Sequence, residues 1–126
     1  MRVLFSGRMF QRLGDLVTAM INDLEIALRA ENRLTNCWRD YTLVLGRDLL
    51  GDWCISVRWG RVGTAGSAAL HGFRNRDEAV AFASILLKRR LTAPRRIGCP
   101  YRLIASSGAE QFGLSGIVRG FSASTA

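Results

Sequence analysis

The chain has 126 residues, of which 48% are hydrophobic and 22% charged, so it suits one globular domain with an apolar core and is too apolar for a disordered protein. No apolar stretch approaches the roughly 20 residues that span a bilayer, and no signal-peptide core follows the first residues, so we expect a cytoplasmic protein without membrane contact. Eighteen basic against ten acidic residues give a formal charge of +8 and a pI near 10.9, which attracts polyanions. All basic residues except Lys88 are arginine, which suits phosphate contact, although an arginine-rich coding bias explains this equally well.

Residues 1–23 form an N-terminal extension for which the sequence pattern predicts a helix. Apolar residues recur at helical spacing from Leu13 to Leu24. Three interpretations remain open: a docking helix, a membrane-surface helix, which Asp15 and Asp23 argue against, or sequence upstream of a true start at Met20.

Three strands joined by short connections are expected next. Residues 24–30 alternate apolar and polar side chains as a strand does, although helical spacing also fits them. Residues 41–45 are predicted to form the second strand, and short connections favour antiparallel neighbours. The third strand starts at Trp53, and its apolar positions, which share one face, are Trp53, Ile55, Val57 and Trp59. The positions on its opposite face are Cys54, Ser56 and Arg58.

A fourth strand and a helix complete the predicted fold. Residues 68–74 form the strand, and Asn75 followed by Glu78 is a capping-box variant that opens the helix. The apolar stripe of this helix comprises Ala79, Val80, Phe82, Ala83, Leu86 and Leu87. The predicted class is therefore α+β, a small antiparallel sheet packed on one face by one long helix. Residues 105–126, rich in Ser, Gly and Ala, are expected to form a flexible tail.

Three glycines, Gly60, Gly63 and Gly66, follow the third strand at positions that can require positive φ or close backbone approach. The string Trp59-Gly60-Arg61, followed by Val62-Gly63-Thr64 and Gly66, resembles the signature of the WGR domain. This small module occurs in poly(ADP-ribose) polymerases and, alone, in short bacterial proteins. Other residues that match the spacing of the family are Asn36, Tyr41, residues 49–53, residues 77–79 and the basic helix end near Arg90. The resemblance covers residues 24–104 and implies that residues 24–30 are the first strand.

Residues suited to catalysis are scarce. His71 is the single histidine and is expected on the sheet surface. The sequence has no nucleophile elbow or phosphate loop, and its spaced glycines do not open a helix, so a dinucleotide fingerprint is not supported. Cys37, Cys54 and Cys99 lack metal-ligand spacing and are odd in number, which favours reduced cysteines in or near the core over zinc or disulfides. We therefore expect no enzyme activity, cofactor or metal.

The predicted site combines an indole, guanidiniums and close backbone approach. The resemblance implies that Trp59 packs on the sugar at a DNA end, and that Arg61 links DNA to neighbouring domains. The resemblance also implies that Asn36, Arg90 and Tyr101 occupy family positions near the DNA backbone. The full set of predicted contact residues is Asn36, Arg58, Trp59, Gly60, Arg61, Lys88, Arg89, Arg90, Arg95, Arg96 and Tyr101.

Two of these predictions have structural alternatives. A regular strand would bury Trp59 with its apolar neighbours, so contact with a ligand would require the strand to bulge or end at Gly60. Cations at the end of a helix stabilise the helix dipole, which explains residues 88–90 without any ligand. That explanation does not extend to Arg95 and Arg96, which lie past Pro94.

The preferred hypothesis is a stand-alone, non-enzymatic module that binds duplex DNA ends or backbone without base specificity. The alternative is a protein-interaction or recruitment module that uses the same surface. Binding through several phosphates weakens steeply as salt rises, whereas an apolar protein contact does not, so salt dependence distinguishes the two.

Overall fold

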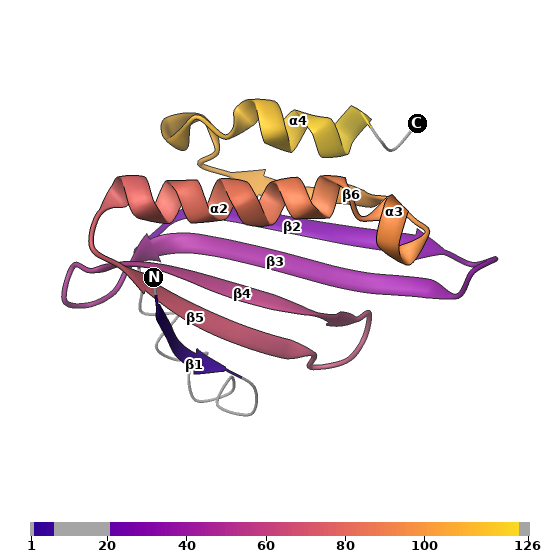
Figure 1. The fold of residues 1–126 in the computed structure, drawn as a ribbon, viewed down its shortest axis with the longest axis horizontal. Helices are drawn as coiled ribbons and strands as arrows, with labels where there is room; N and C mark the ends of the chain where they lie inside the picture. Colours follow the sequence, from indigo (N-terminus) through magenta and orange to yellow (C-terminus); the bar gives the residue numbers. More distant parts are fainter. Residues whose placement is uncertain (1, 7–20, 124–126) are drawn as a thin grey trace.

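The computed structural model describes residues 2–6 and 21–123 (Figure 1). In this part of the chain six antiparallel strands form one sheet in the order β1-β5-β4-β3-β2-β6. The strands are β1 (Arg2–Ser6), β2 (Ile21–Asn32), β3 (Cys37–Arg47), β4 (Trp53–Arg61), β5 (Ser67–Phe73) and β6 (Tyr101–Ser107). The helices are α2 (Arg76–Leu91), α3 (Pro94–Ile97), α4 (Ser115–Ala123) and the short 3-10 helix η2 (Glu110–Phe112).

The core lies between one face of the sheet and the helices, as Figure 1 shows. The strands predicted around residues 24–30, 41–45 and from Trp53 are confirmed, and β2, β3 and β4 pair as antiparallel neighbours. Their register aligns Ile26, Leu43 and Val57 in one row, and each of these side chains is at most 4% exposed. Alternation along the strands therefore places the apolar residues on the helix-covered face.

Helix α2 packs on the sheet through small side chains. Asn75 caps it as predicted, because the Asn75 side chain accepts a hydrogen bond of 2.9 Å from the backbone N–H of Glu78. Ala79, Ala83 and Leu87, spaced four residues apart on one face, are fully buried. Among the described helices none is long and apolar enough to cross a membrane.

The C-terminal residues correct two predictions. The α+β class is confirmed, but α2 does not cover the core alone, because α4 packs against both α2 and β6 (Figure 1). The flexible tail predicted for residues 105–126 is wrong for residues 105–123, which continue β6 and then form η2 and α4. Apolar side chains at near-helical spacing explain the difference: those buried in the core are Phe112, Leu114, Val118 and Phe121. The bulk composition of the tail obscured this pattern.

The helix predicted within the N-terminal extension, residues 1–23, is also wrong where the structure describes it. Strand β2 begins at Ile21, so residues 21–23 are already extended. Ile21 and Asn22 pair with β3, and the register shifts between Asn22 and Leu24. Leu24 fits both the helical and the strand spacing of apolar residues, and it is fully buried as a strand residue. The rest of that prediction, residues 13–20, lies outside the described residues.

Candidate nucleic-acid interface

The end of β4 carries Trp59, Gly60 and Arg61. The register is regular as far as Arg61, which is paired with Arg39, and Trp59 is paired with the buried Tyr41. Trp59 is nevertheless 40% exposed. The strand therefore does not need to bulge to expose the indole.

The helix end explains why Tyr41 is buried while its neighbour Trp59 is not. The guanidinium of Arg90, in the last turn of α2, lies 4.6 Å from the centre of the Tyr41 ring. Trp59 lies one strand farther from this helix end, and its other neighbour, Ser67 of β5, is small. The sequence had offered two alternatives for Trp59, burial on a regular strand or exposure through a bulge at Gly60. The structure combines parts of both, because Trp59 lies on the core face of a regular strand and is still accessible.

A close backbone approach holds the loop after β4. Gly66 has φ +67, and a Cβ at this position would clash with the backbone carbonyl of Trp59. A Cβ at Gly60 would lie 2.7 Å from the Cα of Gly66. Both glycines are therefore required for the loop to fold back on the strand, as the sequence predicted.

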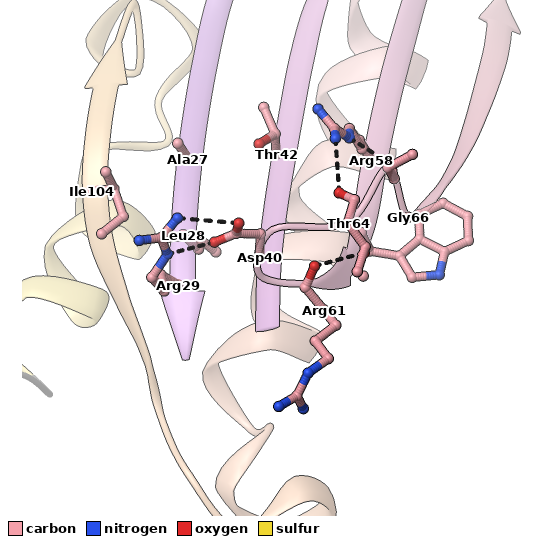
Figure 2. Close-up of a pocket in the computed structure, with 13 residues that line it drawn as sticks. Ala27, Leu28, Arg29, Asp40, Thr42, Arg58, Arg61, Thr64, Gly66 and Ile104 are labelled. Carbon is pink, nitrogen blue, oxygen red and sulfur yellow. Dashed lines mark hydrogen bonds and ion pairs between the residues drawn. The ribbon is translucent and has the colours of Figure 1, made fainter. Parts of the chain in front are cut away.

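Arg58 also stabilises this loop. Its guanidinium donates hydrogen bonds to the carbonyls of Ala65 (2.9 Å) and Thr64 (3.2 Å). The Thr64 hydroxyl in turn donates to the carbonyl of Arg61 at 2.7 Å, and Figure 2 shows these side chains around the loop. Arg58, predicted as a contact residue, therefore has a structural role in holding the loop.

Asn36 connects the turn between β2 and β3 to the end of β4. Its Oδ1 accepts one hydrogen bond from Nε1 of Trp38 and one from Nη2 of Arg61, each of 3.1 Å. Asn36 has φ +52, which asparagine tolerates better than most residues. Because its oxygen is occupied, its amide nitrogen is the group left to donate to a ligand. The fold thus brings together Asn36 and Arg61, which the resemblance had assigned to one site.

An open hollow of about 430 Å³ lies beside this contact. The residues that line it are Thr35, Asn36, Cys37, Trp38, Arg39, Gly60, Arg61 and Ile97. Ile97 belongs to α3, so the hollow also borders the segment that carries the exposed Arg95. Arg39, Arg61 and Arg95 form no ion pair within the described part of the chain, so their charge is available to an anion.

Comparison with known proteins matches residues 26–93 to the model of the WGR domain family. The chain belongs to the WGR domain family. The match extends from β2 to the residues just after α2, so β1, β6 and α4 lie outside it. Over 55 residues the chain is 34% identical to the uncharacterized protein y4dW of Sinorhizobium fredii. That alignment covers 44% of this chain and 27% of the relative, so the chain spans only about a quarter of that protein.

The other predicted contact residues of this WGR protein lie in different environments. Lys88 and Arg89 are exposed in the last turn of α2, and Arg95 is exposed on α3. Arg90 is half-buried over Tyr41, which gives it a packing role. The side chain of Arg96 lies outside the described residues.

Tyr101 is a core residue and not a surface contact. It is 4% exposed, and its ring packs edge-on against that of Tyr41 at 6.3 Å between centres. Burial raises the pKa of Tyr41 to about 12, even though the charge of Arg90 acts in the opposite direction. The prediction that Tyr101 lies near the DNA backbone is therefore not supported by its position.

The opposite face of the sheet holds a feature that the sequence did not reveal. Arg29 of β2 and Asp40 of β3 form a bidentate ion pair, with Nε to Oδ1 at 2.6 Å and Nη2 to Oδ2 at 3.2 Å (Figure 2). The hydrogen bond and charge of Asp40 raise the pKa of Arg29. The pair lines a second hollow of about 170 Å³. A signal was present in the sequence, because the two residues are opposite one another in a hairpin.

The cysteines correct another prediction. Cys37, at the start of β3, and Cys99, between α3 and β6, form a disulfide across 62 residues of sequence. Spacing along the chain carries no information about a pair that only the fold brings together. Cys54 takes no part in a disulfide and is buried, as predicted, and burial raises the pKa of its thiol to about 11. No cluster of potential metal ligands occurs among the described residues.

His71 packs under α2, and is not an open surface residue. It is half-buried, and its ring centre lies 4.8 Å from that of Phe82 on α2. Burial lowers the pKa of His71, so the ring is neutral near pH 7. This environment suits packing more than acid–base chemistry.

Proposed function

We propose that this WGR protein is a non-enzymatic module that binds the backbone or ends of duplex DNA independently of base sequence. The observation that carries the proposal is the hollow at which Asn36, Arg39 and Arg61 meet, with no acidic residue among its lining residues. Two segments that are distant in sequence, residues 36–39 and the end of β4 at Arg61, supply cations and a hydrogen-bond donor to this one place.

The chemistry of the hollow suits phosphate and sugar. Arg39 and Arg61 supply guanidiniums that bind phosphate oxygens in a fork, and the amide nitrogen of Asn36 supplies a neutral donor. The exposed part of Trp59 supplies a ring on which a sugar or base can pack, and stacking of a base on an aromatic ring is worth about 1–3 kcal/mol. Contacts of these kinds give affinity without sequence readout.

The exposed cations extend this surface. Lys88 and Arg89 at the end of α2 and Arg95 on α3 are all exposed, and α3 contributes Ile97 to the hollow. A phosphodiester backbone longer than one nucleotide would therefore meet further positive charge beyond the hollow.

Fluorescence anisotropy of a short blunt-ended duplex, titrated at several salt concentrations, tests the proposal. The affinity should fall linearly on a log–log plot against salt, with a slope that reports the number of phosphate contacts. Trp59→Ala and Arg61→Ala should each weaken binding, with folding checked by circular dichroism. Arg119→Ala is the matched control, because Arg119 is an exposed arginine on α4, outside the hollow.

A protein-recruitment module is the second candidate, and one observation favours it. Leu34, in the turn next to Asn36, is 98% exposed, so an apolar side chain projects beside the same surface. If the protein fails to bind DNA even at low salt, recruitment of a protein partner through this surface becomes the preferred function.

A further inference from the structure

Cys37 lies in sequence between Asn36 and Trp38, two of the three residues that share the hydrogen bonds described above. These two residues share a hydrogen bond at the oxygen that also holds Arg61. The Cys37 side chain is only 7% exposed, but Cys37 is one of the residues that line the 430 Å³ hollow. A covalent bond at Cys37 therefore acts directly on the turn that positions Asn36.

Cys99 anchors the other end of this bond. It directly follows Gly98, the left-handed residue that ends α3, and it is 1% exposed. Helix α3 is a single turn with no side-chain cap at its N-terminus, so its position depends on the chain at either end of it. On its N-terminal side Ala93 is buried in the core, and on its C-terminal side the disulfide ties the chain to β3.

We infer that the Cys37–Cys99 disulfide is a redox-sensitive clamp that holds α3 and the Asn36 turn together as one anion-binding surface. This inference rests on the proposed function, since it concerns the regulation of the same site. In the oxidised protein, α3 is held with Ile97 beside Asn36 and Arg61, and the exposed Arg95 is carried on the same helix. In the reduced protein, α3 and the turn are free to separate, and the ordering of both must then accompany binding, which lowers affinity.

The reductant is a small dithiol, which reduces the Cys37–Cys99 bond in two thiol–disulfide exchange steps. One thiolate of the dithiol attacks a protein sulfur, breaks the Cys37–Cys99 bond and forms a mixed disulfide. The second thiolate of the dithiol then closes a ring and releases the remaining cysteine. The protein gains two electrons and two protons, and the dithiol becomes a cyclic disulfide.

The position of Cys37 also links reduction to ligand binding. Because Cys37 lines the hollow and Cys99 is almost completely buried, the hollow is the direct route by which a reductant reaches the bond. A duplex that occupies the hollow should therefore slow reduction. If the oxidised form binds DNA more tightly, linkage requires that DNA also stabilise the oxidised form by the same factor.

The experiment compares the full-length protein after mild oxidation and after treatment with a dithiol. Thiols are counted in denaturant, and duplex affinity is measured by anisotropy with the reductant removed. We expect one thiol, that of Cys54, in the oxidised protein and three in the reduced protein. The oxidised form should bind the duplex about fivefold or more tightly, and the duplex should slow the appearance of thiols.

Matched variants separate the clamp from general effects of thiols. Cys37→Ser and Cys99→Ser should each bind as the reduced protein does, whether or not dithiol is added. Cys54→Ser is the control, because this variant keeps the disulfide and should respond to dithiol as the wild type does.

Several results would overturn the inference. Three thiols in the oxidised protein would do so, as would equal affinity in the two states with the disulfide present. Loss of the folded circular-dichroism spectrum on reduction would make the bond a purely structural link. Failure of both states to bind DNA at low salt would remove the proposed function, and the inference with it.

Discussion

The two faces of the sheet differ at the end where β4 finishes, although the same strands form both. On the face away from α2, Arg29 is paired with Asp40 and Arg102 is paired with Glu31 at 2.9 Å. On the helix-side face, Arg39 and Arg61 are neighbours in register and have no ion pair among the described residues. At this end of the sheet, alternation along the strands therefore places the ion-paired Arg29 and Arg102 on one face and Arg39 and Arg61 on the other, which the net charge of +8 cannot reveal.

For DNA binding we therefore expect the arginines that have no ion pair to matter more than the total charge of the chain. An arginine already held by a carboxylate has lost donors and part of its field to that partner. Arg39 and Arg61 keep their charge without a carboxylate partner, although Arg61 donates one hydrogen bond to Asn36, so we expect the two faces to respond differently to the same substitution.

Charge reversal on the helix-side face should have the largest effect. In Arg39→Glu/Arg61→Glu two phosphate-binding cations become anions, and duplex affinity should fall by about a hundredfold or more at low salt. Anisotropy measures this, and Arg74→Glu/Arg119→Glu, a pair of exposed arginines that do not line the hollow, is the control of equal charge. An equal loss in both double variants would show that only total charge matters.

Asn36→Asp should have the next largest effect. The new carboxylate still accepts from Trp38 and Arg61, but it offers no donor and adds negative charge to the hollow. We expect duplex affinity to fall by about tenfold, the order of one lost charge-assisted hydrogen bond. The thermal midpoint should not fall, which differential scanning fluorimetry checks, and unchanged affinity would rule out the Asn36 amide as a donor to DNA.

Arg29→Ala should separate the two faces by its lack of effect on DNA. Its partner Asp40 is half-exposed, so water can solvate the freed carboxylate and the thermal midpoint should fall only slightly. Duplex affinity should stay within about twofold of the wild type, because the charge of Arg29 is already balanced by Asp40 and Arg29 does not line the 430 Å³ hollow. If Arg29→Ala weakens binding as strongly as Arg61→Ala, the binding surface includes the opposite face.

The pH dependence of stability should be the smallest effect. Burial lowers the pKa of His71 in the folded state, so the unfolded chain binds a proton at a higher pH than the folded chain does. Stability is therefore complete above the ordinary histidine value of about 6.5 and decreases as pH falls from there towards the lower folded pKa. The thermal midpoint of the wild type should fall as the pH is lowered through this range. The share of that fall that is due to His71 should be absent in His71→Phe. An identical profile in both proteins would show that other groups cause it.

Local patterns in the sequence predicted much of the fold. Alternation identified β4, strand propensity identified β3, and the WGR signature supported β2. The spacing of Asn75 and Glu78 predicted the start of α2, because a cap depends on atoms within one helical turn. The same reasoning failed at residues 21–23, where helical spacing fits the sequence but pairing with β3 makes the chain extended.

The sequence predicted several residues of the candidate site but not the hydrogen bonds and packing contacts between them. Trp59, Arg61 and Asn36 followed from the family signature, whereas the shared oxygen of Asn36 depends on a turn that approaches the end of another strand. The family resemblance placed Tyr101 near the DNA backbone, whereas its burial and its contact with Tyr41 place it in the core. A residue's place in a motif does not report the elements that pack over it.

By itself, the sequence determined the strands with clear alternation, the helix with its cap, the glycines required at the loop after β4 and membership of the WGR family. These properties depend on intervals of a few residues, over which backbone geometry is regular. Only the tertiary structure decided the exposure of Trp59, the ion pair of Arg29 with Asp40, the packing of α4 and the Cys37–Cys99 bond. Each of these depends on which distant segments meet, and that follows from strand register and from where α2 ends, neither of which a local pattern specifies.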